Sequence, residues 1–495
     1  MKALYIFIIL FFTQMLNAQS HSEHLDLWLI QKNKRTYVPE HILFLNQQTQ
    51  EYGRLAIDYT KTSGEYKKSQ EAENSNDFKF SAEGFADIYK FKAYGNFSYA
   101  KTFENKLAND LRGKKDIFNP FYFYANHPNN FQNQQYFANT MFSYELVNKK
   151  LFVGFGIDFD YNWTTGNNDP RPDVVNYFIR YKGDIAWQLD KHSIGLRATY
   201  GKVTEENNIM YKNNEYKSSN KYKDRFLNIS LGYGDIVLSD QNLLLDRKAK
   251  ENTYTLAHQY TGDQLEVATL AKISSYDENS ELNKYKQSFD VYNRFKNKQL
   301  TLQSMLTYTP TDHRQYQLSV KYNNYDGKNL RQIEGLNYKV DHYNANAQLL
   351  ASLSKLFRDT DVQLGLDHTL HSTVRRDYAI GVYSDEKQLL NKVIINTIWD
   401  KKDHFYQVNV TPLYRVKLVN DLSIPETQHT NFTDQVIIPN HQYNNNNALG
   451  VQGEVGYGNK TWLNQYSLYF AISGHYLQSD GLDRSSLNLS LKLYL

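Results

Sequence analysis

Cysteine is absent from the sequence, and proline is scarce at 9 of 495 residues. Without cysteine the chain has no disulfide, no thiolate metal site and no residue to carry the lipid of a lipoprotein. Beyond its first residues it also lacks an apolar run of the ~18 or more residues that a transmembrane helix needs. A formal net charge of only +3 gives no electrostatic reason to expect a nucleic-acid partner.

The first residues predict export. Lys2 is followed by a mostly apolar run over residues 3–16 and by the small residue Ala18, which is the pattern of a signal peptide cleaved after Ala18. An uncleaved membrane anchor is the weaker alternative, because the run is shorter than the ~20 residues that span a bilayer. We therefore expect a signal peptide (1–18), an N-terminal periplasmic or plug-like segment (19–50) and one domain over 51–495.

Aromatic residues are abundant, at 15% of the chain with 41 Tyr and 27 Phe, and they suit both strands and membrane interfaces. Apolar and polar residues alternate over stretches such as 151–163 and 487–495. Strands of the ~9 to 11 residues that cross a bilayer show this alternation, apolar toward lipid and polar toward a wet lumen. The expected fold class is all-β, an antiparallel transmembrane β-barrel of the outer membrane with about 16 to 18 strands. A surface β-helix or propeller would show fixed-period repeats, which the sequence lacks.

Tight periplasmic turns and longer outer loops should alternate in such a barrel. We expect tight turns at 148–150 and 190–192, and longer outer loops at 164–173, 204–224 and 419–447. Helices are expected only in the N-terminal segment, where 24–30 and 41–50 are candidates; this segment could plug the lumen.

Charged residues fall on the inward phase of three consecutive strands. This lumenal charge ladder consists of Asp158, Asp160, Arg180, Lys182, Asp184 and Arg197. The turn at 190–192 is expected to set Asp184 nearly opposite Arg197, and the loop at 164–173 to set Asp158 close to Arg180. Cross-strand pairing that stabilises the wall is the simpler role, and a constriction that selects solutes by charge is the functional alternative.

Two further sets of residues belong to the outer loops and the membrane interfaces. In one outer loop, Asp169 and Arg171 are held in a stiff turn by Pro170 and Pro172. An aromatic belt, favoured over sugar stacking because its members fall toward strand ends, is expected from Trp163, Trp187, Trp399 and Trp462.

No sequence motif supports an enzyme mechanism. GxSxG, HExxH and paired-carboxylate motifs are absent. Asp367 with His368 and His371, or His258 alone, are candidates by residue type only, and His258 and His368 fall on the apolar phase of their strands. We expect a non-enzymatic protein with no cofactor and no metal.

Four short stretches carry a resemblance to a known family. They are Leu27-Trp28-Leu29, Asn119-Pro120-Phe121-Tyr122, the 156–163 strand and the Asp169-Pro170-Arg171-Pro172 loop. In these stretches, which cover the N-terminal third, the chain resembles an uncharacterised family of outer-membrane barrels from Bacteroidota, a domain of unknown function. The resemblance implies an outer-membrane barrel associated with nutrient or metal uptake, and it supplies no catalytic residue.

These features predict a porin-like outer-membrane barrel of a Gram-negative bacterium that acts as a channel or uptake-system component for a solute. The alternative is a non-conducting surface or assembly platform that binds a partner through its loops. A channel should keep small and charged inward residues around its circumference, whereas a platform can fill its lumen with Tyr, Phe and the N-terminal segment. Expected partners are outer-membrane lipid and lipopolysaccharide, the barrel-assembly machinery and an energised outer-membrane receptor.

Overall fold

The computed structural model describes residues 37–48, 51–113, 116, 118–239, 244–283, 291–331, 335–355, 359–462 and 466–495. The predicted signal peptide and the candidate helix at 24–30 lie outside these residues.

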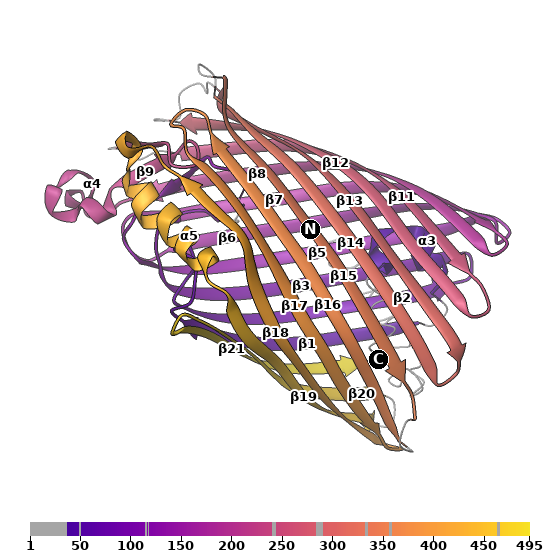
Figure 1. Ribbon diagram of the computed structural model, residues 1–495. Coiled ribbons are helices and arrows are strands. Elements are labelled where there is room, and N and C mark those ends of the chain that lie inside the picture. Colours follow the sequence, from indigo (N-terminus) through magenta and orange to yellow (C-terminus); the bar gives the residue numbers. More distant parts are fainter. Residues whose placement is uncertain are drawn as a thin grey trace.

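Eighteen antiparallel strands form one closed sheet (Figure 1). The first strand pairs with the second on one side and with the last on the other, so the sheet has no open edge. The strands are β1 (Tyr52–Gly64), β2 (Asn74–Ile88), β3 (Phe91–Leu107), β5 (Asn129–Val147), β6 (Leu151–Gly166), β7 (Arg171–Leu189), β8 (His192–Met210), β11 (Leu244–Thr261), β12 (Leu265–Asn283), β13 (Val291–Thr311), β14 (Arg314–Arg331), β15 (Gly335–Leu353), β16 (Thr360–Asp377), β17 (Tyr383–Asp400), β18 (His404–Ser423), β19 (Ala448–Trp462), β20 (Tyr466–Ser479) and β21 (Leu482–Tyr494). The expected all-β barrel and the upper end of its expected strand number are confirmed.

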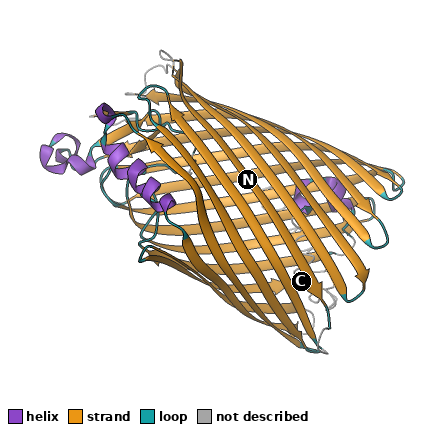
Figure 2. Ribbon diagram, in the orientation of Figure 1, coloured by secondary structure: helices purple, strands orange, loops and turns teal. Residues whose placement is uncertain are grey.

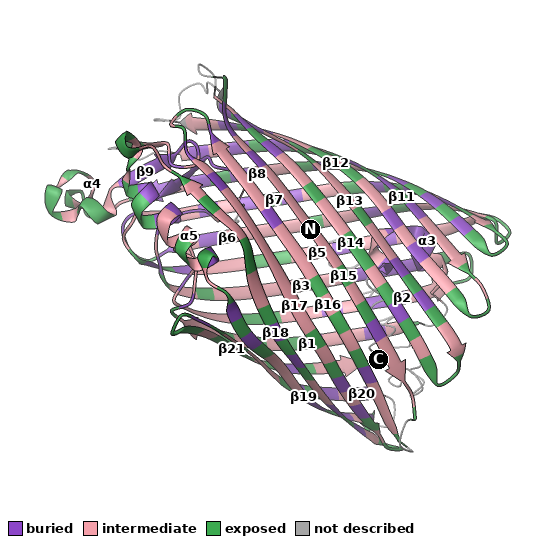
Figure 3. Ribbon diagram, in the orientation of Figure 1, coloured by how far each residue is buried: buried purple, intermediate pink, exposed green. Residues whose placement is uncertain are grey.

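Residues of different burial follow one another along the strands of the barrel wall (Figure 3). On β21, Leu487, Leu489 and Leu491 are exposed on the outer face, while Asn488 and Ser490 between them are partly or fully buried. An outer face of large apolar side chains and a polar inner face are typical of membrane-spanning barrels.

The strands are longer than a bilayer requires, and two of the expected outer loops are wrong for this reason. β7 has 19 residues, whereas ~9 to 11 would cross a bilayer. The loop expected at 164–173 is mostly strand, because the β-branched Thr164 and Thr165 continue the ladder opposite Val174 and Asp173. The loop expected at 204–224 is also wrong in its first part, since β8 continues to Met210.

The two ends of the barrel differ (Figure 2). One end, here called the turn end, has short connections, including the expected turns around 149 and 190, and holds η2 (Val38–Glu40) and α3 (Ile42–Asn46). The expected helix in 41–50 is therefore confirmed, though shorter, but the expectation that helices occur only in the N-terminal segment is wrong, because the loop end also carries helices. The opposite loop end carries α4 (Glu215–Ser218), η3 (Asn220–Arg225), η4 (Glu426–Gln428), η5 (Thr433–Ile437), α5 (Ile438–Asn445) and a separate sheet of β4 (Tyr122–Tyr124), β9 (Leu227–Ser230) and β10 (Ile236–Ser239). None of the helices in the described ranges has the length and apolar character needed to cross a membrane.

Candidate functional site in the barrel lumen

The N-terminal segment described here, residues 37–48, lies inside the turn end of the barrel. His41 caps α3, because its Nδ1 accepts a hydrogen bond from the backbone N–H of Leu43 at 3.0 Å. Ile42 and Leu45 are fully buried and pack in one apolar cluster with side chains of the barrel wall. The segment is thus docked on the wall by a packed interface.

Two inward-facing glycines form the floor of this docking site. A β-carbon added at Gly195 on β8 would overlap the ring of His41, and one added at Gly154 on β6 would overlap Ile42 Cγ2. Glycine in a strand often marks a close approach of another part of the chain. The wall therefore has a socket shaped for α3.

The predicted charge ladder contributes directly to the socket. Asp184 lies opposite Arg197 in the β7–β8 register, and Arg197 Nε donates to Asp184 Oδ1 at 2.7 Å. Arg197 Nη1 also donates to the backbone oxygen of Glu40 at 2.5 Å, and His41 Nε2 lies 3.3 Å from Asp184 Oδ1. Burial lowers the pKa of His41 to about 4, against the opposing effect of Asp184, so the docked imidazole is neutral at neutral pH.

Another part of the ladder pairs differently from the expectation. Asp158 is opposite Arg180 in register, yet it forms its ion pair with Lys182, at 2.5 Å. Arg180 instead reaches across β8 to Glu251 on β11, at 2.9 Å. The Arg180 side chain passes over Gly201, where an added β-carbon would touch both Arg180 and Glu251. Because Gly201 has no side chain, Arg180 can reach past β8 to the next strand.

Two lysines that the sequence did not single out also hold the segment. Lys272 on β12 pairs with Glu40 at 2.9 Å, and Lys92 on β3 donates to the backbone oxygens of Asn46 and Gln48 at 3.0 and 2.7 Å. Burial alone would raise the pKa of Glu40, but Lys272, Arg197 and Lys182 together hold the pKa below its usual range. These contacts join residues far apart in the chain, and no local pattern signals them.

At the loop end, three long connections fold inward as a unit, here called the loop cap (residues 108–128, 211–239 and 424–447). Phe121 and Phe123 are fully buried there and pack with Ile209 and Leu245 at the loop ends of β8 and β11. The cap thus has an apolar core that it shares with the barrel wall.

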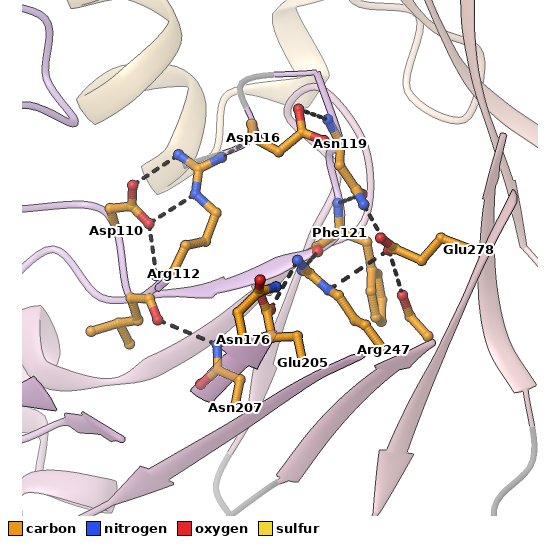
Figure 4. Close-up of polar contacts among 12 residues, drawn as sticks. Asp110, Arg112, Asp116, Asn119, Phe121, Asn176, Glu205, Asn207, Arg247 and Glu278 are labelled. Carbon is orange, nitrogen blue, oxygen red and sulfur yellow. Dashed lines mark hydrogen bonds and ion pairs between the residues drawn. The ribbon is translucent and has the colours of Figure 1, made fainter. Parts of the chain in front are cut away.

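Buried charges tie the loop cap to the wall (Figure 4). Arg247 on β11 lies between two carboxylates, 3.1 Å from Glu205 and 3.8 Å from Glu278, and it also donates to the backbone oxygen of Phe121. Glu278 also accepts a hydrogen bond from Asn119 Nδ2 of the cap at 2.8 Å. Removing the cation would leave two buried carboxylates close together.

A second buried pair lies within the cap itself. Arg112 Nη2 contacts Asp110 at 2.8 Å (Figure 4). The guanidinium also lies over the ring of Tyr122, 4.0 Å from its centroid. Asn207 of β8 donates to the backbone oxygen of Leu111 at 3.3 Å. These contacts fix the first cap connection against the wall.

The predicted outer-loop residues organise another part of the cap. Asp169 accepts hydrogen bonds from the backbone N–H groups of Lys212 and Asn213, each at 2.9 Å, and from Arg171 Nε at 2.6 Å. Burial alone would raise the pKa of Asp169, but these donors hold it below its usual range. The last residue of the charge ladder, Asp160, accepts a hydrogen bond from Gln135 Nε2 at 2.9 Å.

The four predicted belt tryptophans lie toward both ends of the barrel. Trp187, Trp399 and Trp462 are outward-facing near the turn end, with exposed fractions of 42%, 40% and 41%. Trp163 lies near the loop end, where its Nε1 donates to Asp173 at 2.8 Å. Their role in a belt stays a prediction.

The histidine candidates do not converge on a catalytic or metal site. His258 stacks beside His192, with ring nitrogens 3.2 Å apart, and His368 lies 2.7 Å from Asn391. Among the residues that the structure describes, no group of three or more His, Asp or Glu side chains is arranged to hold a metal ion.

A polar cavity of about 440 Å³ lies in the lumen against strands β15 to β21. Amides such as Gln407, Asn409 and Gln452 line it, together with Asp367 and Lys392. The lumen is therefore asymmetric: the N-terminal segment packs in one cluster with strands from β2 to β13, while the polar cavity lies along β15 to β21.

A family model matches residues 42–495. The chain belongs to DUF6850, a family of unknown function. The match begins at the first residue of α3, so the family's common unit includes this helix as well as the barrel. A comparison with curated proteins found no match.

Several solved structures share the barrel form with this DUF6850 chain at very low sequence identity. The match to the copper transporter OprC has a TM-score of 0.48 at 8% identity, and it covers 88% of this chain but only 62% of the OprC chain. The match to the alcaligin outer membrane receptor FauA from Bordetella pertussis has a TM-score of 0.37 at 9% identity, and it covers 88% of this chain and 75% of the FauA chain. The match to the ferric yersiniabactin uptake receptor FyuA from Yersinia pestis has a TM-score of 0.38 at 9% identity, and it covers 90% of this chain and 80% of the FyuA chain. The description of the barrel rests on its strand pairing and not on these matches.

Proposed function

We propose that this protein is a non-enzymatic transport protein of the outer membrane, whose lumen passes a polar solute. In this proposal the structure is a closed state, with the N-terminal segment acting as the gate at the periplasmic turn end and the loop cap covering the outer end. The chain would be exported, inserted by the barrel-assembly machinery and surrounded by lipid and lipopolysaccharide. An energised receptor is a further proposed partner.

The observation that carries the proposal is the difference between the two walls of the lumen. A barrel that served only as a platform could fill its whole interior, whereas here a cavity lined by amides and charges remains along β15 to β21. The segment that occupies the opposite wall is held by buried apolar side chains and by polar contacts, and it lies in a glycine socket that it can leave without unpairing a strand. A polar lining and a displaceable blocker suit a gated pathway.

The platform remains the second candidate, on one specific observation. Phe121, Phe123 and Tyr124 of the cap are fully buried at the loop end, which is the aromatic filling that a platform permits. The platform would bind a partner through the outer surface of this cap and conduct nothing.

A disulfide lock tests the gate. Because the β-carbon position of Gly154 touches Ile42 Cγ2, the pair Ile42→Cys/Gly154→Cys has its β-carbons near the ~3.5 to 4.5 Å that a disulfide needs. The chain has no other cysteine, so the bond forms in a clean background. We expect the oxidised double variant to be silent in planar bilayers and to conduct after reduction, with Ile42→Cys alone insensitive to reductant.

Removal of residues 19–48 provides the second arm. The truncated barrel, shown to be folded by heat-modifiable gel migration, should conduct steadily. Silence of the folded protein in every form, reduced, oxidised and truncated, would rule out the transport proposal and leave the platform.

A further inference from the structure

We propose that the polar cavity binds the anionic group of a small hydroxylated solute, a carboxylate or a phosphate, through Lys392 with Arg415 beside it. The inference rests on the proposed function, since it places this anion site on the path of the transported solute.

Lys392 is a cation in the cavity without a carboxylate partner. It lies directly opposite Asp367 in the β16–β17 register. Asp367 does not pair with it and instead accepts hydrogen bonds from Asn346, Gln348 and Thr369 at 3.0, 3.2 and 3.2 Å. Within the described ranges, Lys392 forms neither an ion pair nor a hydrogen bond, so its ammonium group is available to a ligand.

A second cation, Arg415, lies on the neighbouring strand, outside the residues that line the cavity. In the β17–β18 register Lys392 is opposite Leu413 and Leu390 is opposite Arg415, so the two cations are diagonal neighbours on the inner face. Such diagonal positions are roughly 7 to 8 Å apart, within reach of one small anion for long side chains.

The surroundings of Arg415 supply no counter-charge. Its guanidinium lies over the rings of Tyr66 and Tyr443, at 5.3 and 4.7 Å from their centroids. It donates to neutral oxygens, including the backbone oxygen of Asn446 at 3.4 Å, and its Nε is buried without a partner. In the part of the chain that the structure describes, no carboxylate forms an ion pair with it.

The rest of the cavity fits the body of a hydroxylated solute. Glu454, its other carboxylate besides Asp367, accepts from the hydroxyl of Tyr469 at 2.9 Å. His475 lines the cavity and interacts electrostatically with Lys392, so basic groups face the same space. The amide lining offers hydrogen bonds to hydroxyl groups, and its volume of about 440 Å³ is in the range of small-ligand sites, ~300 to 1,000 Å³. A charged hydrogen bond from Lys392 would then decide which solute binds.

Titration calorimetry of the purified full-length protein tests the site with glucose, glucuronate and glucose 6-phosphate. We expect one or both anions to bind about tenfold or more tightly than glucose, the effect of one charged hydrogen bond. Comparison of the carboxylate with the phosphate identifies the anion. Lys392→Gln should remove this preference, while Arg415→Lys, which keeps the charge, should retain most of it.

Lys79→Gln is the matched control, because Lys79 is a lysine on the inner phase of β2 outside the cavity. Equal binding of glucose and both anions, no binding of any of the three, or equal effects of Lys392→Gln and Lys79→Gln would overturn the inference. Permeation of the same solutes into liposomes separates it from the proposed function. Anion binding with no permeation through either the intact protein or the chain without residues 19–48 would leave the site standing and refute transport, and permeation without anion preference would do the reverse.

Discussion

Gly154, Gly195 and Gly201 are inward-facing positions where the absence of a side chain admits a distant part of the chain. The first two admit α3, and the third lets Arg180 reach Glu251. Alternation in the sequence places these glycines on the inner phase, but it does not say what approaches them. The same limit applies to the charge ladder: Asp184 and Arg197 could be paired from the tight turn between their strands, whereas their contacts with His41 and Glu40 join residues about 150 positions apart.

His41 makes docking of the N-terminal segment dependent on pH. Burial lowers its pKa from 6.5 to about 4, so the docked state favours the neutral ring. Docking should therefore be strongest above pH 6.5 and weaken as the pH falls from 6.5 toward 4, where the released segment binds the extra proton. The full difference is roughly 3 kcal/mol.

Labelling of Ile42→Cys by a thiol reagent measures this release, normalised to Ser218→Cys on the exposed α4, so that the reagent's own pH dependence cancels. We expect relative labelling to rise in acid. His41→Asn keeps a capping oxygen for α3 but cannot titrate, and it should abolish the rise. A rise that persists in His41→Asn would assign the pH dependence to another group.

At the scale of elements, the strands and the long connection expected at 419–447 were predictable, whereas the way the long connections fold together was not. Period-two alternation locates strands because each residue faces either lipid or lumen, as on β6 and β21. The same rule fails beyond the membrane, where β6 and β7 continue as a ladder through residues expected to be a loop. The loop cap could not be predicted at all, because Phe121 and Arg247 meet across more than a hundred residues.

The cap should depend on Arg247. Its side chain and those of Glu205 and Glu278 are nearly inaccessible, so Arg247→Met would leave two unpaired buried carboxylates. Breaking a buried pair in this way costs about 3 to 5 kcal/mol. We expect trypsin to cleave the exposed, lysine-rich connection around α4 and η3 much faster in this variant.

Arg294→Met, which breaks an exposed pair with Asp277, is the control and should leave cleavage unchanged. The triple variant Arg247→Met/Glu205→Gln/Glu278→Gln removes the unpaired charges and should restore part of the protection. Equal cleavage of Arg247→Met and Arg294→Met would show that the network does not hold the cap.

For the whole molecule, the contacts that close the barrel differ from those that hold the N-terminal segment. The barrel closes through the ladder between β1 and β21, which continues past the last strand because Gly53 and Leu495 exchange backbone hydrogen bonds at 3.2 and 2.8 Å. The described N-terminal residues 37–48 contribute no strand to this ladder. Each strand of the closed sheet is hydrogen-bonded on both sides, so losing one opens the ring, whereas losing the segment does not.

Two deletions should therefore have opposite effects. A chain without residues 37–48 is expected to keep the compact, heat-modifiable form on gels, with an unfolding temperature close to that of the intact protein. A chain without residues 482–495 loses β21, leaves β1 and β20 as open edges and should not reach that form. Loss of the compact form in the first deletion would mean that α3 and its socket are part of the barrel's folding core, and the segment could not then leave the lumen as a gate.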